Sequence, residues 1–207
     1  MGSSEAPPRF QSRFEHHGAG HVFAVVEKMR LGWLLKHFPP LLVWALYVFV
    51  NGFMTIALLA TLGVLTDTPF VFPSLGPTAY LFFFAPLGTS SSPRNAILGH
   101  AIGLLCGYGA FWITGTPNAR EAFHLVYWPR VIAASLSLAS TGALMVLLRV
   151  SHPPAGATTL IVSLGIISKP SYLVVIEVAV CLLTTQAFVI NRLAGLPYPI
   201  WKSSQTT

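Results

Sequence analysis

Two short stretches decide how this chain folds: residues 73–78, with the sequence PSLGPT, and residues 153–158, with the sequence PPAGAT. They align without a gap at an offset of eighty positions, and a proline, a glycine and a threonine coincide. Each stretch breaks an apolar run, because proline removes a backbone donor and disfavours helix in the residue before it. The pattern predicts extended chain at each proline group and a short helix after it, over Gly76–Ala85 and Ala155–Ile167.

The composition places both stretches in a membrane protein. Only 9% of the 207 residues are charged and 54% are hydrophobic, whereas a soluble domain carries about 25% charged residues. About 20 apolar residues span a bilayer as a helix. The long apolar runs therefore predict four continuous transmembrane helices, over Leu41–Leu65, Asn95–Thr114, Pro129–Val150 and Ser171–Leu193.

The predicted fold is an all-α membrane protein with four continuous transmembrane helices and two half-helix segments broken by Pro and Gly. The transmembrane domain covers residues 39–202 and consists of two repeats, residues 41–115 and residues 129–193. Residues 1–38 are predicted to be a cytoplasmic N-terminal arm, disordered at first and then amphipathic over residues 22–37. Residues 203–207 form a short tail.

The number of crossings depends on the two broken segments. If they span, the chain crosses six times and its halves are inverted; if they are re-entrant, it crosses four times and its halves are parallel. An extended stretch followed by a short helix covers roughly 30–35 Å, which is enough to span. The distribution of Lys and Arg fits both versions equally, so the length argument favours six crossings.

The starts of the two half-helices are the predicted substrate site. The first N–H groups of a helix have no intrahelical partner and carry the positive end of its dipole. Two such ends facing each other near the middle of the membrane would bind an anion without a formal charge, although a Pro-Gly break is also compatible with a simple kink. The residues predicted to form this site are Ser74, Gly76, Thr78, His152, Pro153, Pro154, Gly156, Thr158 and Thr159.

Other polar residues of the apolar runs are candidates for coupling or gating. A carboxylate inside a membrane is a functional candidate by default, but Glu177 would also serve as a structural partner for a hydroxyl. His100 would either carry a proton or be a packed, satisfied side chain, and Arg149 would either anchor the chain or attract an anion at the mouth of the site. The full set of coupling or gating candidates is His100, Glu177, Arg149, Asn95 and Asn191.

The remaining features limit the partners. The formal charge of +6 does not indicate nucleic-acid binding, because the basic residues flank the apolar runs, where they set topology. They predict a cytoplasmic N-terminus in a bacterial inner (plasma) membrane or its equivalent. Cys106 and Cys181 lie inside apolar runs and are interpreted as packing residues; no metal or cofactor is expected. Glycines at 99, 103, 107 and 109 permit close helix approach and are compatible with a homo-oligomer.

Two other classes of function are disfavoured. An intramembrane enzyme would need a nucleophile–base pair or metal ligands at workable spacing, and neither is visible, so no catalytic residue is predicted. A non-transporting membrane subunit would carry a further soluble domain or a large charged loop. Paired Gly/Pro-interrupted apolar segments are instead the best sequence indication of a transporter's binding site.

Residues 151–160, SHPPAGATTL, resemble the signature of the HPP family of integral membrane proteins. Three further segments are similar to that family's pattern: Phe72–Ala79, Pro93-Arg94-Asn95 with Gly99-His100, and Asn191 with Tyr198-Pro199. Thr159 and Pro77 stand where smaller residues are expected. The resemblance implies four spanning helices and, since plant relatives are known as nitrite transporters of the chloroplast envelope, transport of nitrite or a similar small anion. An anion channel, or a transporter of another small solute, is the alternative.

Overall fold

The computed structural model describes residues 30–115 and 128–203, and within these residues every regular element is helical. Most of the predicted arm, the loop of residues 116–127 and nearly all of the tail lie outside the described residues. In chain order the helices are α2 (Leu31–His37), α3 (Pro40–Thr66), α4 (Leu75–Phe84), the short 3-10 helix η1 (Thr89–Ser91), α5 (Pro93–Thr114), α6 (Trp128–Leu147), α7 (Ala155–Ser163) and α8 (Pro170–Leu193).

Four of these helices, α3, α5, α6 and α8, are long and apolar enough to cross a membrane. They agree with the four predicted spans, and α4 and α7 are the two predicted half-helices. Proline stands in the first turn of α3, α5 and α8, where its missing N–H group costs nothing and its fixed φ angle suits a helix. The sequence therefore located the helix starts to within a few residues.

Two helices end earlier than predicted, and each ends in the same type of turn. Arg149 has φ +52° after α6, and the N–H of Val150 donates to the carbonyl of Met145. Gly165 has φ +76° after α7, and the N–H of Ile166 donates to the carbonyl of Ile161. These are Schellman turns, in which a left-handed residue closes the helix. The predictions that these helices reach Val150 and Ile167 are therefore wrong.

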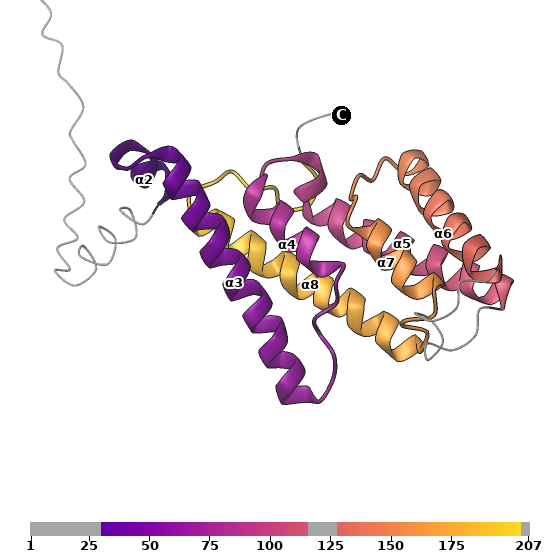
Figure 1. Cartoon of the computed structure of the whole chain (residues 1–207). Helices are drawn as coiled ribbons and strands as arrows, with labels where there is room; N and C mark the ends of the chain where they lie inside the picture. The colour runs from indigo at the N-terminus through magenta and orange to yellow at the C-terminus, as the bar shows by residue number, and fades with distance from the viewer. Residues whose placement is uncertain (1–29, 116–127, 204–207) are drawn as a thin grey trace, which may run out of the picture.

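Contacts between distant residues define one end of the helix bundle, called here the α2 end. The N–H of Leu31 donates to the carbonyl of Ala194, just after α8, over 3.0 Å. The N–H of Arg94 at the start of α5 donates to the carbonyl of Trp201, also over 3.0 Å. The starts of α2 and α5 and the end of α8 therefore lie at the same end of the bundle (Figure 1).

The segment that contains α4 runs from the opposite end back to the α2 end. α3 has 27 residues and is therefore about 40 Å long. Asp67, which follows its last residue, thus lies far from the α2 end. Ser91, by contrast, accepts a hydrogen bond from the Tyr198 hydroxyl at the α2 end. Burial raises the pKa of Tyr198 and so keeps this donor protonated.

The segment that contains α7 runs the other way. The carbonyls of Leu148 and Arg149 accept hydrogen bonds from the Arg94 guanidinium at the α2 end, over 3.1 and 2.9 Å. α8 then begins at Pro170, about 36 Å along its axis from the end that pairs with α2. Each broken segment thus connects the two ends of the bundle (Figure 1).

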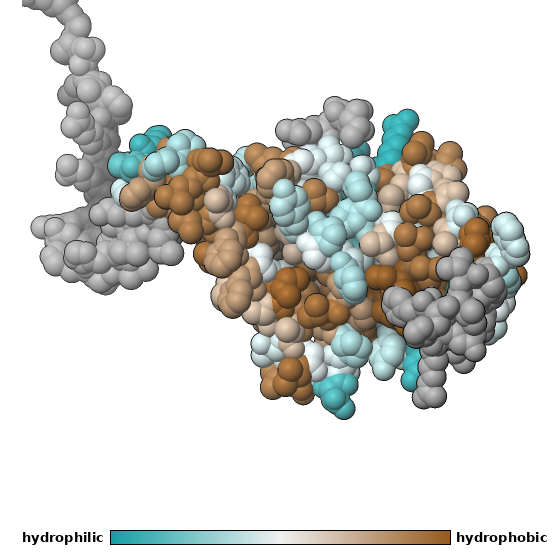
Figure 2. Space-filling model, viewed as in Figure 1, coloured by the Kyte–Doolittle hydropathy of each residue, from teal (hydrophilic) through white to brown (hydrophobic). Residues whose placement is uncertain are grey.

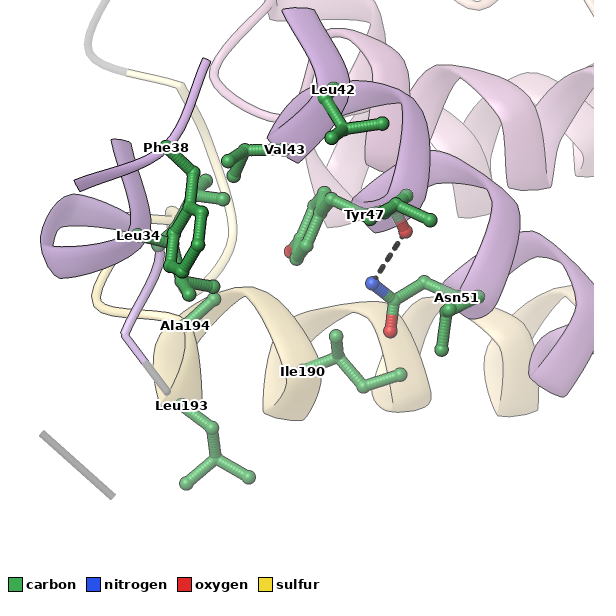
Figure 3. Close-up of a pocket in the computed structure, with 12 residues that line it drawn as sticks. Leu34, Phe38, Leu42, Val43, Tyr47, Asn51, Ile190, Leu193 and Ala194 are labelled. Carbon is green, nitrogen blue, oxygen red and sulfur yellow. Dashed lines mark hydrogen bonds between the residues drawn. The ribbon is translucent and has the colours of Figure 1, made fainter. Parts of the chain in front are cut away.

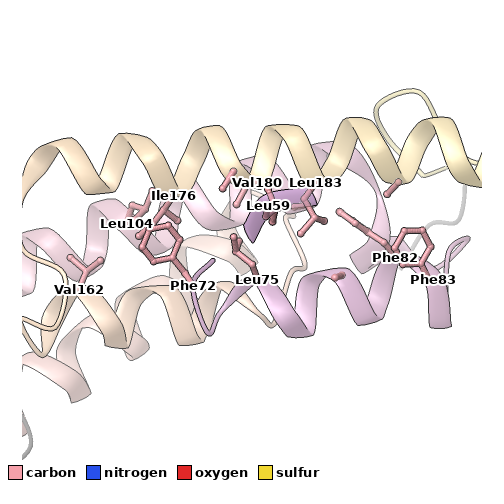
Figure 4. Packing of buried hydrophobic residues seen from close by; sticks show 14 residues of the cluster. Leu59, Phe72, Leu75, Phe82, Phe83, Leu104, Val162, Ile176, Val180 and Leu183 are labelled. Carbon is pink, nitrogen blue, oxygen red and sulfur yellow. The ribbon is translucent and has the colours of Figure 1, made fainter. Parts of the chain in front are cut away.

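The packing is dense around α5 and sparse around α3. A cluster of buried apolar side chains joins α4 to α8 and includes Phe72, Leu75, Phe82, Val180 and Leu183 (Figure 4). α3 leans away from the other helices (Figure 1) and buries only three of its residues. Figure 2 shows apolar side chains over much of this face, as expected of a surface that meets lipid.

Candidate functional site

Four buried side chains form a continuous hydrogen-bonded chain where α4, α5 and α7 meet. Thr78 Oγ1 lies 2.9 Å from His100 Nε2 and 3.1 Å from His152 Nε2. His100 Nδ1 lies 2.7 Å from Thr158 Oγ1, and His152 Nδ1 lies 2.7 Å from the carbonyl oxygen of Ser90. All four side chains are fully buried. We call Thr78, His100, His152 and Thr158 the histidine–threonine network.

The partners of the network assign its protons. A carbonyl oxygen only accepts, so His152 Nδ1 carries the proton that is shared with Ser90, and in the neutral ring Nε2 accepts from the Thr78 hydroxyl. Thr78 Oγ1 then accepts from His100 Nε2–H, and His100 Nδ1 accepts from the Thr158 hydroxyl. The Ser74 carbonyl, 3.3 Å from Thr78 Oγ1, is a second and longer acceptor. Both imidazoles are thus fully hydrogen-bonded as neutral rings.

The network joins the starts of the two half-helices. Thr78 is the fourth residue of α4 and Thr158 is the fourth residue of α7, so the two threonines that coincide in the sequence alignment meet through His100. His100 is seven residues into α5, or about 10 Å from its start. The network therefore lies in the half of α5 that is nearer the α2 end, between that end and the middle of the helix.

A stripe of glycines on α5 permits this arrangement. A Cβ atom at Gly99 would lie 2.7 Å from His152 Cβ, one at Gly103 would lie 2.7 Å from the Ala155 carbonyl oxygen, and one at Gly107 would lie 2.6 Å from the Thr159 carbonyl oxygen. Real Cβ atoms do not come so close to a neighbour. The predicted close approach is confirmed for these three glycines, which bring α7 against α5.

The backbone at the start of α7 differs from the prediction. The N–H groups of Ala155, Gly156 and Ala157 donate to the carbonyls of His152, Pro153 and Pro154 over 2.9–3.1 Å. These N–H groups have no acceptor within α7, but the proline turn before the helix supplies acceptors, so they are not free to bind an anion in this arrangement. Hydroxyl and imidazole groups, together with the dipole of the helix, are what this start presents to a ligand.

An unpartnered hydroxyl lies beside the network. Ser74 precedes α4 and is fully buried, and its Oγ atom has no hydrogen-bond partner among the described residues. A buried hydroxyl without a partner is costly. It is therefore a candidate donor for a ligand.

A cavity of about 430 Å³ opens between the end of α6 and the loop that leads to α7. Arg149 and Ser151 are exposed residues of its wall, and Thr89, Pro153 and the buried His152 also line it. Arg94 stabilises this wall through its two hydrogen bonds to the turn after α6. The cavity thus combines a cation with a residue of the histidine–threonine network.

Comparison with known proteins identifies the family. The family model described as "HPP, transmembrane region" matches residues 37–199. The chain belongs to the HPP family. No curated protein and no solved structure matches it. The match takes in both broken stretches and the whole histidine–threonine network, so the geometry described above is that of an HPP transmembrane domain.

Some predicted site residues of this HPP protein face away from the network. Thr159 Oγ1 accepts a hydrogen bond from Thr141 of α6 over 3.1 Å. Gly156 faces α6, since a Cβ atom there would lie 3.3 Å from Leu138 Cδ1. Gly76 is exposed, with nothing within 4 Å of its Cβ position. The structure therefore brings together Thr78, Thr158 and His152 from the predicted set, with Ser74 beside Thr78.

The coupling and gating candidates lie in different places. His100 is in the network, and Arg149 is at the cavity. Asn95 Nδ2 donates to the Thr89 carbonyl over 3.0 Å and supports the η1 turn. Asn191 accepts from the Tyr47 hydroxyl over 2.7 Å and donates to the Phe82 carbonyl over 3.1 Å, which ties α8 to α3 and α4.

Glu177 is separate from all of these residues. It lies two turns into α8, and both of its carboxylate oxygens are buried without a hydrogen-bond partner among the described residues. The alternative that Glu177 binds a hydroxyl is not observed. An unpartnered carboxylate in a membrane helix is costly as an anion.

The sequence reasoning missed two features of the site. Ser137 and Thr141 of α6 donate to Ser163 and Thr159 of α7 over 2.9 and 3.1 Å. Their four-residue spacing in an apolar run was a usable signal, since such residues share a helix face. The Ser90 carbonyl, which orients His152, is a backbone group and left no signal in the sequence.

Proposed function

We propose that this HPP family protein transports a small inorganic anion across the membrane, with nitrite as the first candidate. Family membership is consistent with a transporter in general. The observation that carries the proposal is the cavity that Arg149 and His152 line together, because it gives an anion a route from an exposed cation to the polar groups between the two half-helices.

The chemistry of the network suits a weakly held monovalent anion. An anion needs donors, and Ser74, Thr78 and Thr158 offer hydroxyl groups while His100 offers an imidazole N–H. None of these groups is a fixed charge, so binding stays weak enough for release. In the arrangement observed, the threonine and histidine donors bind one another. An anion would therefore displace the Thr78–His152 hydrogen bond, which links substrate entry to a rearrangement of α4 against α7.

We further propose that both broken segments cross the membrane, which gives six crossings and two inverted halves. The first support is that each broken segment connects the two ends of the bundle. The second is the set of basic residues at the α2 end, which would place this end and the N-terminus in the cytoplasm. Those basic residues are Arg30, Lys36, Arg94, Arg149, Arg192 and Lys202. The membrane itself would be a bacterial inner membrane or its equivalent.

Cysteine labelling tests this topology. With Cys106 and Cys181 replaced, Thr68→Cys and Leu87→Cys are labelled separately in intact cells by an impermeant maleimide. Six crossings predict that the two positions react from opposite sides of the membrane. Re-entrant segments predict labelling from the same side, and that result would overturn the inverted arrangement.

Proton coupling is proposed for Glu177, because its carboxylate is buried without an observed partner. A carboxylate in this state would load and release a proton as the helices around it rearrange. Glu177→Gln should abolish the response of anion uptake to an imposed pH gradient while leaving anion exchange intact. An unchanged response in both Glu177→Gln and His100→Ala would eliminate proton coupling through these groups.

Uptake into proteoliposomes tests the function. Purified protein should take up nitrite with saturation, and nitrate, formate and chloride serve as competitors that define the substrate class. Thr158→Val removes one network hydroxyl at constant volume and should strongly reduce uptake, whereas Thr61→Val on the exposed face of α3 should not. Flux that never saturates would favour an anion channel. The absence of both flux and binding for every anion would refute the proposal.

A further inference from the structure

A second and larger cavity lies far from the network. It is a groove of about 750 Å³ between α2, α3 and α8, within the range of about 300–1,000 Å³ that ligand sites occupy. Its wall is almost wholly apolar, and Figure 3 shows residues of all three helices around it. Each side of the groove contributes large apolar side chains: Leu34 and Phe38 at the α2 side, Leu46 and Val50 on α3, and Ile190 and Leu193 on α8.

The two polar residues of the wall offer little to a polar ligand. The Tyr47 hydroxyl donates to Asn191 Oδ1 over 2.7 Å. Asn51 Nδ2 donates to the Tyr47 carbonyl, also over 2.7 Å, as the dashed line in Figure 3 shows. Both of these donors are already bound within the protein. The groove therefore selects an apolar occupant.

The length of the groove matches one leaflet of a bilayer. Along α3 it extends from Leu42 to Asn51, a distance of about 14 Å at the rise of an α-helix. The hydrocarbon core of a bilayer is about 30 Å thick, so one leaflet supplies about half of that. At the α2 side the lining includes Leu31, Leu34 and Phe38, and Phe38 lies next to the prolines that open the first span. The groove thus runs from one membrane surface towards the midplane.

The mouth of the groove is basic. Arg30, Lys36 and Arg192 are exposed at the α2 end. Arg30 directly precedes the groove residue Leu31, whereas the Arg192 guanidinium lies over the ring of Phe188, 5.5 Å from its centroid and outside the groove lining. The side chain of Arg30 comes within 3.5 Å of the Cβ position of Gly195, next to the groove residue Ala194. Trp33 stacks on His37 with ring centroids 4.0 Å apart, and such aromatic groups suit the headgroup level of a membrane.

No acidic side chain of the described residues competes at this mouth. Asp67 ends α3 at the opposite end of the bundle. Glu177 is fourteen positions before Asn191, or about 20 Å along α8. A basic rim above an apolar groove is complementary to a phosphate that carries an acyl chain.

We propose that the groove binds an anionic membrane phospholipid, with one acyl chain along α3 and its phosphate beside Arg30, in the positive field that Lys36 and Arg192 add at the same end of the bundle. The bound lipid fills the gap that the lean of α3 leaves beside α8. It adds apolar contacts to a helix that buries only Val43, Thr55 and Leu59 within the protein. The proposal is independent of the transported substrate.

Native mass spectrometry of the full chain in mild detergent tests the proposal with phosphatidylglycerol and phosphatidylcholine as probes. The wild type should retain phosphatidylglycerol about tenfold more than phosphatidylcholine, because each basic residue at an anionic surface adds attraction. Arg30→Gln, Lys36→Gln and Arg192→Gln combined should remove the preference. Lys169→Gln, at the other end of α8, is the control and should leave it unchanged.

A second pair of variants separates binding from folding. Leu46→Trp fills the groove and should abolish retention of both lipids, whereas Leu105→Trp, at a side chain that is 74% exposed on α5, should not. Thermal melting in the same detergent checks that each variant is folded. Equal retention of both lipids by the wild type would overturn the proposal. So would a cross-link between two copies through a cysteine at Leu46, which would assign the groove to a second subunit.

Discussion

The two half-helices begin with related sequences but lie in different surroundings. α7 is enclosed between α5 and α6, against the glycines of one and the hydroxyls of the other. α4 keeps one face open: Tyr80 is 48% exposed and Phe84 is 59% exposed. The broken stretches alone therefore do not determine how closely a half-helix is held.

The difference arises on the neighbouring long helices. At the same offset of eighty positions, Gly99, Gly103 and Gly107 of α5 correspond to Ala179, Leu183 and Ala187 of α8. The three α8 residues are fully buried and already fill the space beside α4. Glycine on α5 instead lets the backbone of α7 come into contact.

The two halves also differ in the polarity of the residues at equivalent positions. His100 and His152 of the network correspond in sequence to Val180 and Phe72, which belong to the apolar cluster (Figure 4). At these positions the α7 half of the molecule is therefore held by hydrogen bonds, whereas the α4 half is held by dispersion contacts. Hydrogen bonds exchange partners more readily than a close-packed core deforms, which makes the α7 side the better place for a ligand-controlled rearrangement.

Filling the glycine stripe of α5 with a large side chain should destabilise the protein most. In Gly103→Leu, the new side chain meets the Ala155 carbonyl oxygen, which lies 2.7 Å from the Cβ position. The substitution should destabilise the protein by about 3 kcal/mol, as overpacking does. Gly109→Leu on the same helix is the control, since its Cβ position has nothing within 4 Å. Melting temperatures in detergent compare the two, and equal losses would show that the stripe does not hold α7.

The next effect comes from the network. Thr78→Val keeps the volume but leaves His100 Nε2 and His152 Nε2 without their shared partner. Thr78→Val should lower the free energy of unfolding by about 1–2 kcal/mol, the range for buried polar groups that lose a hydrogen bond. Nitrogen NMR of the imidazole side chains should also report a changed tautomer at His100. A melting temperature and an NMR spectrum identical to the wild type would contradict the proposed proton assignment.

A smaller effect is expected between α6 and α7. Thr141→Val removes the hydroxyl that donates to Thr159, and one such bond between membrane helices contributes about 0.6 kcal/mol. Thr185→Val on the exposed side of α8 is the matched control, because its hydroxyl bonds only within its own helix. Chemical denaturation from detergent micelles measures the difference. A loss in the control as large as that in Thr141→Val would remove any role for the pairing of α6 and α7.

The last prediction concerns a gain in stability and compares the half-helices directly. Gly76→Ala adds a methyl group where nothing lies within 4 Å, whereas Gly156→Ala places one 3.3 Å from Leu138 Cδ1. Alanine favours helix over glycine, so Gly76→Ala should stabilise by up to about 0.5–1 kcal/mol. Gly156→Ala should stabilise the protein less than Gly76→Ala does, or destabilise it slightly. If Gly156→Ala stabilises more, α7 is not the more enclosed helix.

The elements that depend on local chemistry follow from the amino-acid sequence. Apolar length determines the four spans, and the prolines at 40, 93 and 170 mark helix starts within one or two residues. The breaks at residues 73–78 and 153–158 and the close approach at Gly103 also follow from single residues and their immediate neighbours. The repeat arrangement and the number of crossings stay predictions.

Which polar groups meet depends on the packing of the helices and does not follow from local sequence. Thr78 and His152 are 74 positions apart, and Tyr47 and Asn191 are 144 apart, so no local pattern specifies either pair. The Ser90 carbonyl that orients His152 is 62 positions away from it, and it also reaches its partner only because the chain folds back. Apolar length and proline act over a few residues, whereas a buried hydrogen bond needs both partners delivered to one place by the packing of several helices.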